Sequence, residues 1–167
     1  MVKKHEIAIM LDTGTDAAPA WKRIKKSTTL TISMNPQTED FDYIEDVNPT
    51  TELKNYKPTL DQDLTMYRNE EDYKMVWPYF YEMRTGSEAH VPVLIVFKQE
   101  GNTTDGYAAW KTDSVLSVQD MNAVDSKLNF QLLFGGTIER GTVKMSDSGI
   151  VFTPGGTVTV PGGGGTE

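Results

Sequence analysis

The stretch FDYIEDVNPTTELKNYKPTLDQDLTMY, residues 41–67, is long and polar, contains Pro49 and Pro58, and closes on an alternating strand. The chain around it consists mostly of short β-type runs. Loops this long are uncommon in compact domains and are usually functional or disordered. We therefore expect an arm over about residues 35–58 that projects from the domain and reaches a neighbouring copy. Assembly, rather than catalysis, is the first hypothesis.

The overall composition limits the classes of protein. A chain of 167 residues with 38% hydrophobic content fits one domain with a real core. The 16 basic and 24 acidic residues give a net charge of −8, which argues against tight nucleic-acid binding, because Lys and Arg neutralise the phosphates. The sequence has no cysteine, which excludes a disulfide framework and a thiolate metal site.

Targeting and membrane segments are not expected. The first apolar run is too short and too charged for a signal peptide, and no run approaches the ~20 apolar residues of a membrane span. We expect no direct membrane insertion. The protein should stay in the cytoplasm where it is made, or be built into a particle assembled there.

Strands are predicted on both sides of the arm, over 27–34 and 59–67, because apolar and polar residues alternate in each. In the second strand Asp61 and Asp63 share the face opposite the leucines. Two carboxylates on one face should look into water or at a partner, since unpaired burial of either would be costly. Further strands are expected at 91–99, 107–118, 126–137, 142–145 and 150–153.

One helix is predicted over about residues 69–85. Asn69 suits the N-cap, acidic residues follow it, and Gly86 suits the C-cap. Pro78 should kink this helix or make it begin late. Its aromatic residues are interpreted as core, with a ligand pocket as the minor alternative. They are Tyr73, Trp77, Phe80 and Tyr81.

These elements predict a mainly β (α+β) fold: a β-sandwich or partly open barrel with one flanking α-helix and a long projecting loop. Residues 1–153 should form the single domain. Residues 154–167 should be a flexible Gly-rich tail.

The sequence does not indicate a catalytic, cofactor or metal site. His5 and His90 have no neighbouring ligand at metal spacing, and no G-x-S-x-G motif occurs. The Gly-Gly pairs do not follow phosphate-binding spacing, and the acidic cluster at 39–46 lacks the pattern of an EF-hand. We expect no enzyme activity and no cofactor.

A basic cluster precedes the first predicted strand. Its residues are Lys22, Arg23, Lys25 and Lys26. Such a cluster could contact DNA phosphates. In a chain of net negative charge, pairing with the acidic arm of an adjacent copy is the preferred interpretation.

The order of threonine-rich strand, long arm, returning strand and single helix resembles the major tail tube protein family of long-tailed bacteriophages. The residues that carry this resemblance are 27–34, 43–67 and 69–84. The family is similar in fold to the tube proteins of contractile phage tails, tail-like bacteriocins and type VI secretion. The resemblance implies six copies closing a ring, inner sheets joining into one barrel, and rings stacking into a virion tube that DNA crosses. It also implies tape-measure and tail-terminator or tip proteins as partners.

Candidate residues follow from these interpretations. The inter-subunit candidates are Asp40, Asp42, Tyr43, Ile44, Glu45, Leu53 and Tyr56 on the arm, with Lys22, Arg23 and Lys25 in the basic cluster. Asp61 and Asp63 are candidates for the lumen, where acidic groups would repel DNA within the ~8 Å screening length.

Three alternatives remain open. One is a small-molecule or carbohydrate-binding β-sandwich with the arm as a lid over an aromatic pocket. The others are a head–tail joining protein and the tube of a tail-like bacteriocin.

Overall fold

The computed structural model describes residues 1–45 and 47–158. Over these residues the chain forms one α-helix, two short 3₁₀ helices and ten strands. In chain order they are η1 (Lys4–Glu6), β1 (Ile7–Asp12), β2 (Trp21–Arg23), β3 (Ser27–Ser33), β4 (Pro36–Phe41), β5 (Thr50–Tyr56), β6 (Thr59–Thr65), α1 (Glu71–Tyr81), η2 (Gly86–Ala89), β7 (His90–Asn102), β8 (Gly106–Asn122), β9 (Lys127–Ser146) and β10 (Gly149–Pro154).

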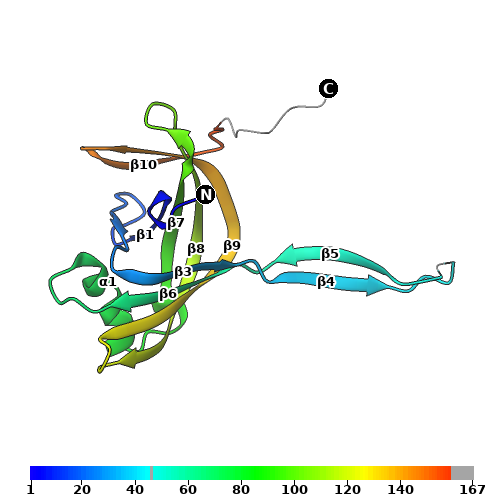
Figure 1. Cartoon of the computed structure of the whole chain (residues 1–167), viewed down its shortest axis with the longest axis horizontal. Helices are drawn as coiled ribbons and strands as arrows, with labels where there is room; N and C mark the ends of the chain where they lie inside the picture. The colour runs from blue at the N-terminus through cyan, green and yellow to red at the C-terminus, as the bar shows by residue number, and fades with distance from the viewer. Residues whose placement is uncertain (46, 159–167) are drawn as a thin grey trace.

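Eight strands form one antiparallel sheet in the order β2-β1-β7-β8-β9-β6-β3, with β10 added beside the second half of β9 (Figure 1). The predicted fold class is confirmed: over the described residues the chain is mainly β with one flanking α-helix. The sheet does not close, because β2 and β3 stand at its two ends. The predicted strands at 126–137 and 142–145 are parts of one strand, β9, which passes through the irregularity at Gly135-Gly136.

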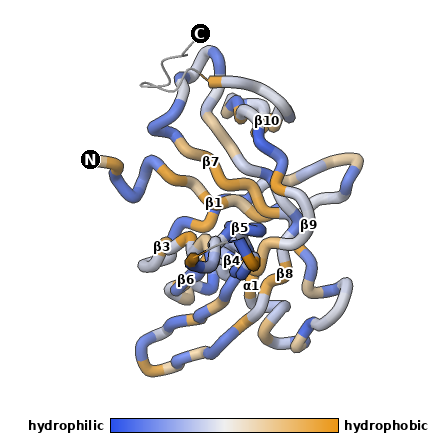
Figure 2. The backbone as a smooth tube through the Cα atoms, turned by 90° about the vertical axis from the view of Figure 1, so that its right-hand side faces the viewer, coloured by the Kyte–Doolittle hydropathy of each residue, from blue (hydrophilic) through white to orange (hydrophobic). Residues whose placement is uncertain are grey.

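The middle of the sheet is buried on both faces. In β7, Val93 and Ile95 join the larger core cluster, while Leu94 and Val96 point to the opposite face and join a smaller one. This two-sided burial matches the apolar sequence of β1 and of residues 91–97 of β7, where Figure 2 shows mainly hydrophobic colour. The larger cluster lies between the sheet and α1, with Val76 of the helix fully buried in it.

The helix is shorter than predicted and turned differently. It begins at Glu71 and ends at Tyr81, with Pro78 inside it, so it does not begin late. Val76 and Phe80 face the core as expected. The core assignment of the other aromatic residues is wrong. Tyr73, Trp77 and Tyr81 stack on one another along the outer side of the helix, with ring centroids 5.5 and 6.2 Å apart.

A buried carboxylate sets this rotation. Asp72 is 1% exposed, and its carboxylate accepts hydrogen bonds from the backbone N–H groups of Lys25 and Lys26, both at 2.9 Å. Residue 72 therefore points at the β2–β3 connection. Residues 73, 77 and 81, about one step further round the helix, point away from it.

The left-handed residue that follows the helix is Met83, two residues after Tyr81, and not the predicted Gly86. The N–H of Met83 bonds to the Phe80 carbonyl, and that of Arg84 to the Tyr79 carbonyl, which is the Schellman pattern. This pattern needs a left-handed residue, and Met83 has φ +48°. A side chain in that conformation costs about 1–2 kcal/mol, which glycine avoids.

The projecting arm is a β-hairpin, not a loop without regular structure. β4 and β5 pair with each other as a separate two-stranded sheet that continues the β3–β6 pair away from the body (Figure 1). At the junction Asn35 adopts φ +43°, and its side chain donates to the Lys57 carbonyl at 3.1 Å.

The end of the chain is described only in part. β10 ends at Pro154, and residues 159–167 of the predicted Gly-rich tail lie outside the described residues. Asp46, in the predicted acidic cluster, also lies outside them. Among the helices that the structure describes, none has the length and apolarity needed to cross a membrane.

Candidate assembly site

The hairpin β4–β5 is a surface that lacks its own core. Every residue of β5 is exposed, and no residue of β4 or β5 belongs to either core cluster. Large apolar side chains are nevertheless present on it, including Ile44 at 106% and Tyr43 at 57% exposure. An isolated two-stranded hairpin is at best marginally stable in water, so this arrangement calls for a partner surface.

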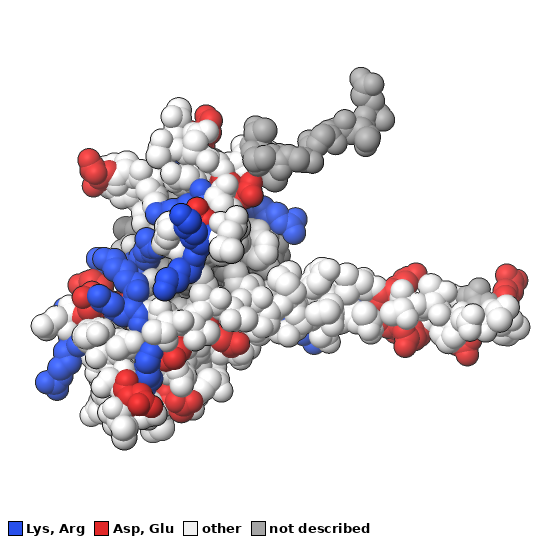
Figure 3. All heavy atoms as spheres, viewed as in Figure 1, with Lys and Arg blue, Asp and Glu red and all other residues white. Residues whose placement is uncertain are grey.

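The seven predicted arm residues all lie on this hairpin or its turn. They are Asp40, Asp42, Tyr43, Ile44, Glu45, Leu53 and Tyr56. Two carboxylates have partners within the hairpin: Asp40 accepts from the Thr51 hydroxyl at 2.7 Å, and Glu39 pairs with Lys54. Asp42 and Glu45 are exposed, and acidic side chains mark the far half of the hairpin in Figure 3.

The basic cluster lies on the body, where Figure 3 shows Lys and Arg gathered. Its members separate: Arg23 and Lys25 line a groove, whereas Lys22 pairs with Glu71 at 3.7 Å on the surface. No ion pair in the described chain joins this cluster to the hairpin. Within one molecule the two predicted inter-subunit surfaces therefore stay apart.

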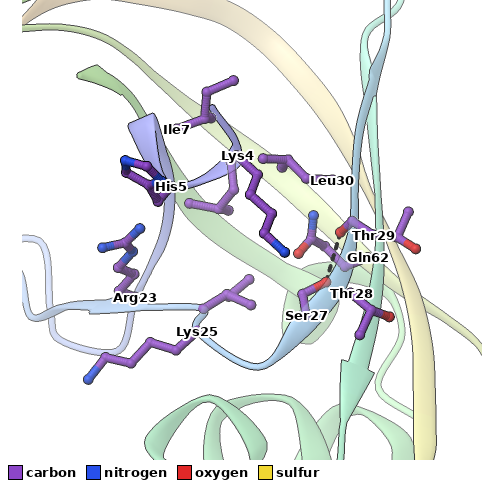
Figure 4. A pocket seen from close by; sticks show the side chains of 12 residues that line it. Lys4, His5, Ile7, Arg23, Lys25, Ser27, Thr28, Thr29, Leu30 and Gln62 are labelled. Carbon is purple, nitrogen blue, oxygen red and sulfur yellow. Dashed lines mark hydrogen bonds between the residues drawn. The ribbon is translucent and has the colours of Figure 1, made fainter. Parts of the chain in front are cut away.

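The groove, which we call the basic groove, has a volume of about 580 Å³ and lies at the open side of the sheet, between β1 and β3 (Figure 4). Lys4 and His5 of η1 join Arg23 and Lys25 on its rim. Its remaining lining residues are Ile7, Ile9, Ile24, Ser27, Thr28, Thr29, Leu30 and Gln62. A cationic rim over an apolar floor fits an acidic segment that also carries an apolar side chain.

Sequence reasoning missed two parts of this groove. Lys4 and His5 reach it because β1 lies inside the sheet, which the ambiguous first 25 residues did not reveal. Asp72 holds the β2–β3 connection that carries Lys25, and it was read only as one of several acids near a helix N-terminus. Local sequence cannot distinguish a buried acid that caps distant backbone from a solvated neighbour.

The lumen candidates lie on the face of the sheet that points away from the larger core cluster and α1. β6 alternates strictly, with Leu60, Gln62 and Leu64 inside, so Asp61 and Asp63 point the other way. These acids are not free: Asp61 accepts from Gln131 at 2.6 Å, and Asp63 accepts from Thr28 at 3.0 Å and lies 3.5 Å from Lys127. The face is thus a hydrogen-bonded polar surface with partly compensated negative charge.

The strands under this polar face have an open edge on both sides. In the order β8-β9-β6-β3, the free side of β3 carries no partner strand among the described residues. On the other side β7 begins at His90, opposite Val115, so Leu116–Asn122 of β8 pairs only with β9. Unpaired edges of this kind are templates for pairing with another chain.

A second groove, of about 560 Å³, lies along this open part of β8, beneath the end of α1. Arg84 covers one side of it, 4.8 Å from the centre of the Tyr79 ring and hydrogen-bonded to Glu82. Burial raises the pKa of the Tyr79 hydroxyl, although the Arg84 guanidinium opposes this shift. The contacts of Arg84 with Tyr79 and Glu82 hold the turn that follows the helix.

The arm does not cover the helix aromatics. The hairpin extends from the side of the body opposite α1 (Figure 1), so it forms no lid over Tyr73, Trp77 and Tyr81 in this conformation.

Comparisons with known proteins identify the fold. No family model matches this chain, and no curated protein matches it. A chain from the tail of an empty GTA particle, computed with helical refinement and C6 symmetry, has a TM-score of 0.55 at 10% identity, over 83% of this chain and 97% of that one. A chain from the 6-fold symmetrised baseplate of the anti-feeding prophage (AFP) has a TM-score of 0.42 at 11% identity, over 80% and 89%. This chain therefore shares the fold of the GTA tail chain, which agrees with the predicted resemblance at the level of fold.

Proposed function

We propose that this chain is a structural, non-enzymatic subunit of a phage-like tail, whose copies close into six-membered rings that stack into a tube for DNA. The observation that carries this proposal is the part of the sheet formed by β8, β9, β6 and β3. It has an open edge at β3 and at Leu116–Asn122 of β8, and its face opposite the core is polar. The tail-related fold supports it.

The direction of the strands favours ring closure. Because all neighbours in this sheet are antiparallel, β3 and β8 run in opposite directions. The edge of β3 in one copy can therefore pair with Leu116–Asn122 of the next copy and continue the antiparallel pattern. A ring built this way leaves neither edge exposed, and the same head-to-tail contact repeats at every interface.

This ring places the polar face on the lumen, since the opposite face carries the apolar core and α1. Asp61 and Asp63 would then line the channel. Their hydrogen bonds to Gln131 and Thr28 hold them in place, and their charge disfavours DNA adhesion over the ~8 Å screening length.

The hairpin acts as a second contact. Its acidic, partly apolar end would reach another copy and meet Lys22 and Lys26, the exposed members of the basic cluster that lie outside the basic groove and have the opposite charge. Tape-measure and tail-terminator or tip proteins would bind the finished tube. The protein would be located in the virion, as part of its tail.

Cysteine trapping tests the ring, because the chain has no cysteine of its own. Thr31 of β3 and Ser117 of β8 stand at the two ends of one cross-strand row, which runs through β6 and β9. We expect Thr31→Cys combined with Ser117→Cys, or with Asp120→Cys to allow a shifted register, to form intermolecular disulfides under oxidation. These bonds require Cα atoms about 4.4–6.8 Å apart.

The control pairs Thr31→Cys with Ser148→Cys, which lies in the β9–β10 turn away from this edge. Electron microscopy of the wild-type protein should show rings or hollow rods. Monomers at high concentration, together with no disulfide specific to either test pair, would overturn the proposed function.

A further inference from the structure

The residue at the left-handed position after α1 is the wrong type for local stability. Met83 takes φ +48° where glycine carries no conformational cost, and its side chain is 80% exposed. No burial within the described molecule offsets that cost. A strained residue that presents an apolar side chain to solvent points to a contact outside the molecule.

Met83 stands at the open edge of β8. It lines the second groove together with Val118 and Asp120, so it belongs to the surface that the proposed ring brings against a neighbour. The turn is held on both sides of Met83 by the two Schellman hydrogen bonds and by Arg84 over Tyr79. Because the backbone is fixed, the Cα–Cβ bond of Met83 points in one direction.

The opposite edge carries a matching surface. The basic groove lies beside β3 and is lined by Leu30 and Gln62, which face the core side of the sheet. The second groove is lined by Leu116 and Val118, which face that same side. When β3 of one copy pairs with β8 of another, both grooves lie in the layer outside the lumen and meet.

Charge also matches across these two edges. The rim of the basic groove carries Lys4, Arg23 and Lys25. The turn around Met83 carries Glu82 and Glu88, both exposed; Glu82 already pairs with Arg84, whereas Glu88 has no ion pair among the described residues. The pairing of opposite charges favours this contact and disfavours like edges meeting.

We infer that the Met83 turn of one copy docks into the basic groove of the next, with the Met83 side chain over Ile24 and Leu30 and the flanking glutamates facing the cationic rim. This inference rests on the proposed β3–β8 ring contact. It adds a side-chain lock to the backbone pairing, outside the lumen and independent of the hairpin.

Substitution of Met83 gives opposite effects on folding and on assembly. Met83→Gly should raise the thermal midpoint of the unassembled protein, because glycine relieves the left-handed conformation. The same variant should raise the concentration needed for assembly at least about tenfold, a change that corresponds to 1.4 kcal/mol. Met83→Leu, which keeps an apolar side chain at the same position, should assemble near the wild-type concentration, as measured by sedimentation velocity.

A second cysteine pair separates this inference from the proposed function. Met83→Cys with Lys25→Cys should form an intermolecular disulfide in assembled protein, alongside the disulfide of the Thr31 pairs. If a Thr31 pair forms its bond but the 83–25 pair does not, and Met83→Gly assembles like wild type, the docking inference is wrong and the ring remains. If no pair forms, the ring itself is refuted.

Discussion

Loss of the Asp72 side chain should lower the free energy of unfolding strongly, although this side chain is small. Its carboxylate is buried and accepts three backbone hydrogen bonds at 2.9 Å, from Lys25, Lys26 and Tyr73. A hydrogen bond to a charged group contributes about 1.5–3 kcal/mol, and each buried donor left without a partner costs about 1–3 kcal/mol. Since these terms are not additive, Asp72→Ala should lower the free energy of unfolding by about 3–5 kcal/mol.

That loss is large against a total stability of about 5–15 kcal/mol. With an m-value of about 2 kcal/mol/M, the urea midpoint should fall by about 1.5–2.5 M at unchanged m. The assay is urea unfolding followed by tryptophan fluorescence, at a protein concentration below assembly. Asp72→Asn keeps one acceptor oxygen, so its midpoint should lie between those of Asp72→Ala and wild type.

The adjacent acid supplies the control. Glu71 is exposed and makes only a 3.7 Å surface pair with Lys22, so Glu71→Ala should cost less than about 1 kcal/mol. Both variants remove one negative charge from the same helix turn, which isolates burial as the difference between them. If Asp72→Ala unfolds within about 0.5 kcal/mol of Glu71→Ala, the proposed link between α1 and the β2–β3 connection is incorrect.

Three further outcomes are expected. Replacing residues 36–56 by a two-residue Asn-Gly turn should leave the urea midpoint nearly unchanged, because the hairpin contributes nothing to the core. The same variant should form no rods in electron micrographs, and rods of normal length would contradict the role of the hairpin as an assembly contact. Gly141→Ala should lower the free energy of unfolding by about 1–3 kcal/mol in the urea assay, since the new Cβ would lie 2.2 Å from the Thr153 carbonyl oxygen. The control Gly135→Ala should cost far less, because the nearest atom to its new Cβ is 3.9 Å away. Raising NaCl from about 0.05 to 0.5 M should reduce the assembled fraction in sedimentation runs if opposite charges join the copies, and an unchanged fraction would exclude that driving force.

Strictly local patterns were read correctly from the sequence. The alternation in 59–65 places Leu60 and Leu64 inside, as predicted, because the two faces of a strand are separated by single residues. The same alternation in 127–134 buries Leu128 and Leu132. The arm was located by its polarity and length. Its pairing into a hairpin was missed, since Pro49 and the charged residues hide the β pattern and the Asn35 turn depends on side-chain bonds to the far strand.

What the sequence alone determined is therefore the class of fold, the alternation of its strands and the presence of a projecting segment. Only the tertiary structure decided which strand edges stay open, how α1 is rotated, and that Lys4 shares a groove with Lys25. The physical reason is range: alternation and turn chemistry act between near neighbours, whereas the bond from Asp72 to Lys25 spans 47 positions of the chain and exists only after folding. Met83 shows the same limit. Its conformational free-energy cost comes from the left-handed backbone at the helix end, whereas the contact inferred for its side chain lies on a second copy.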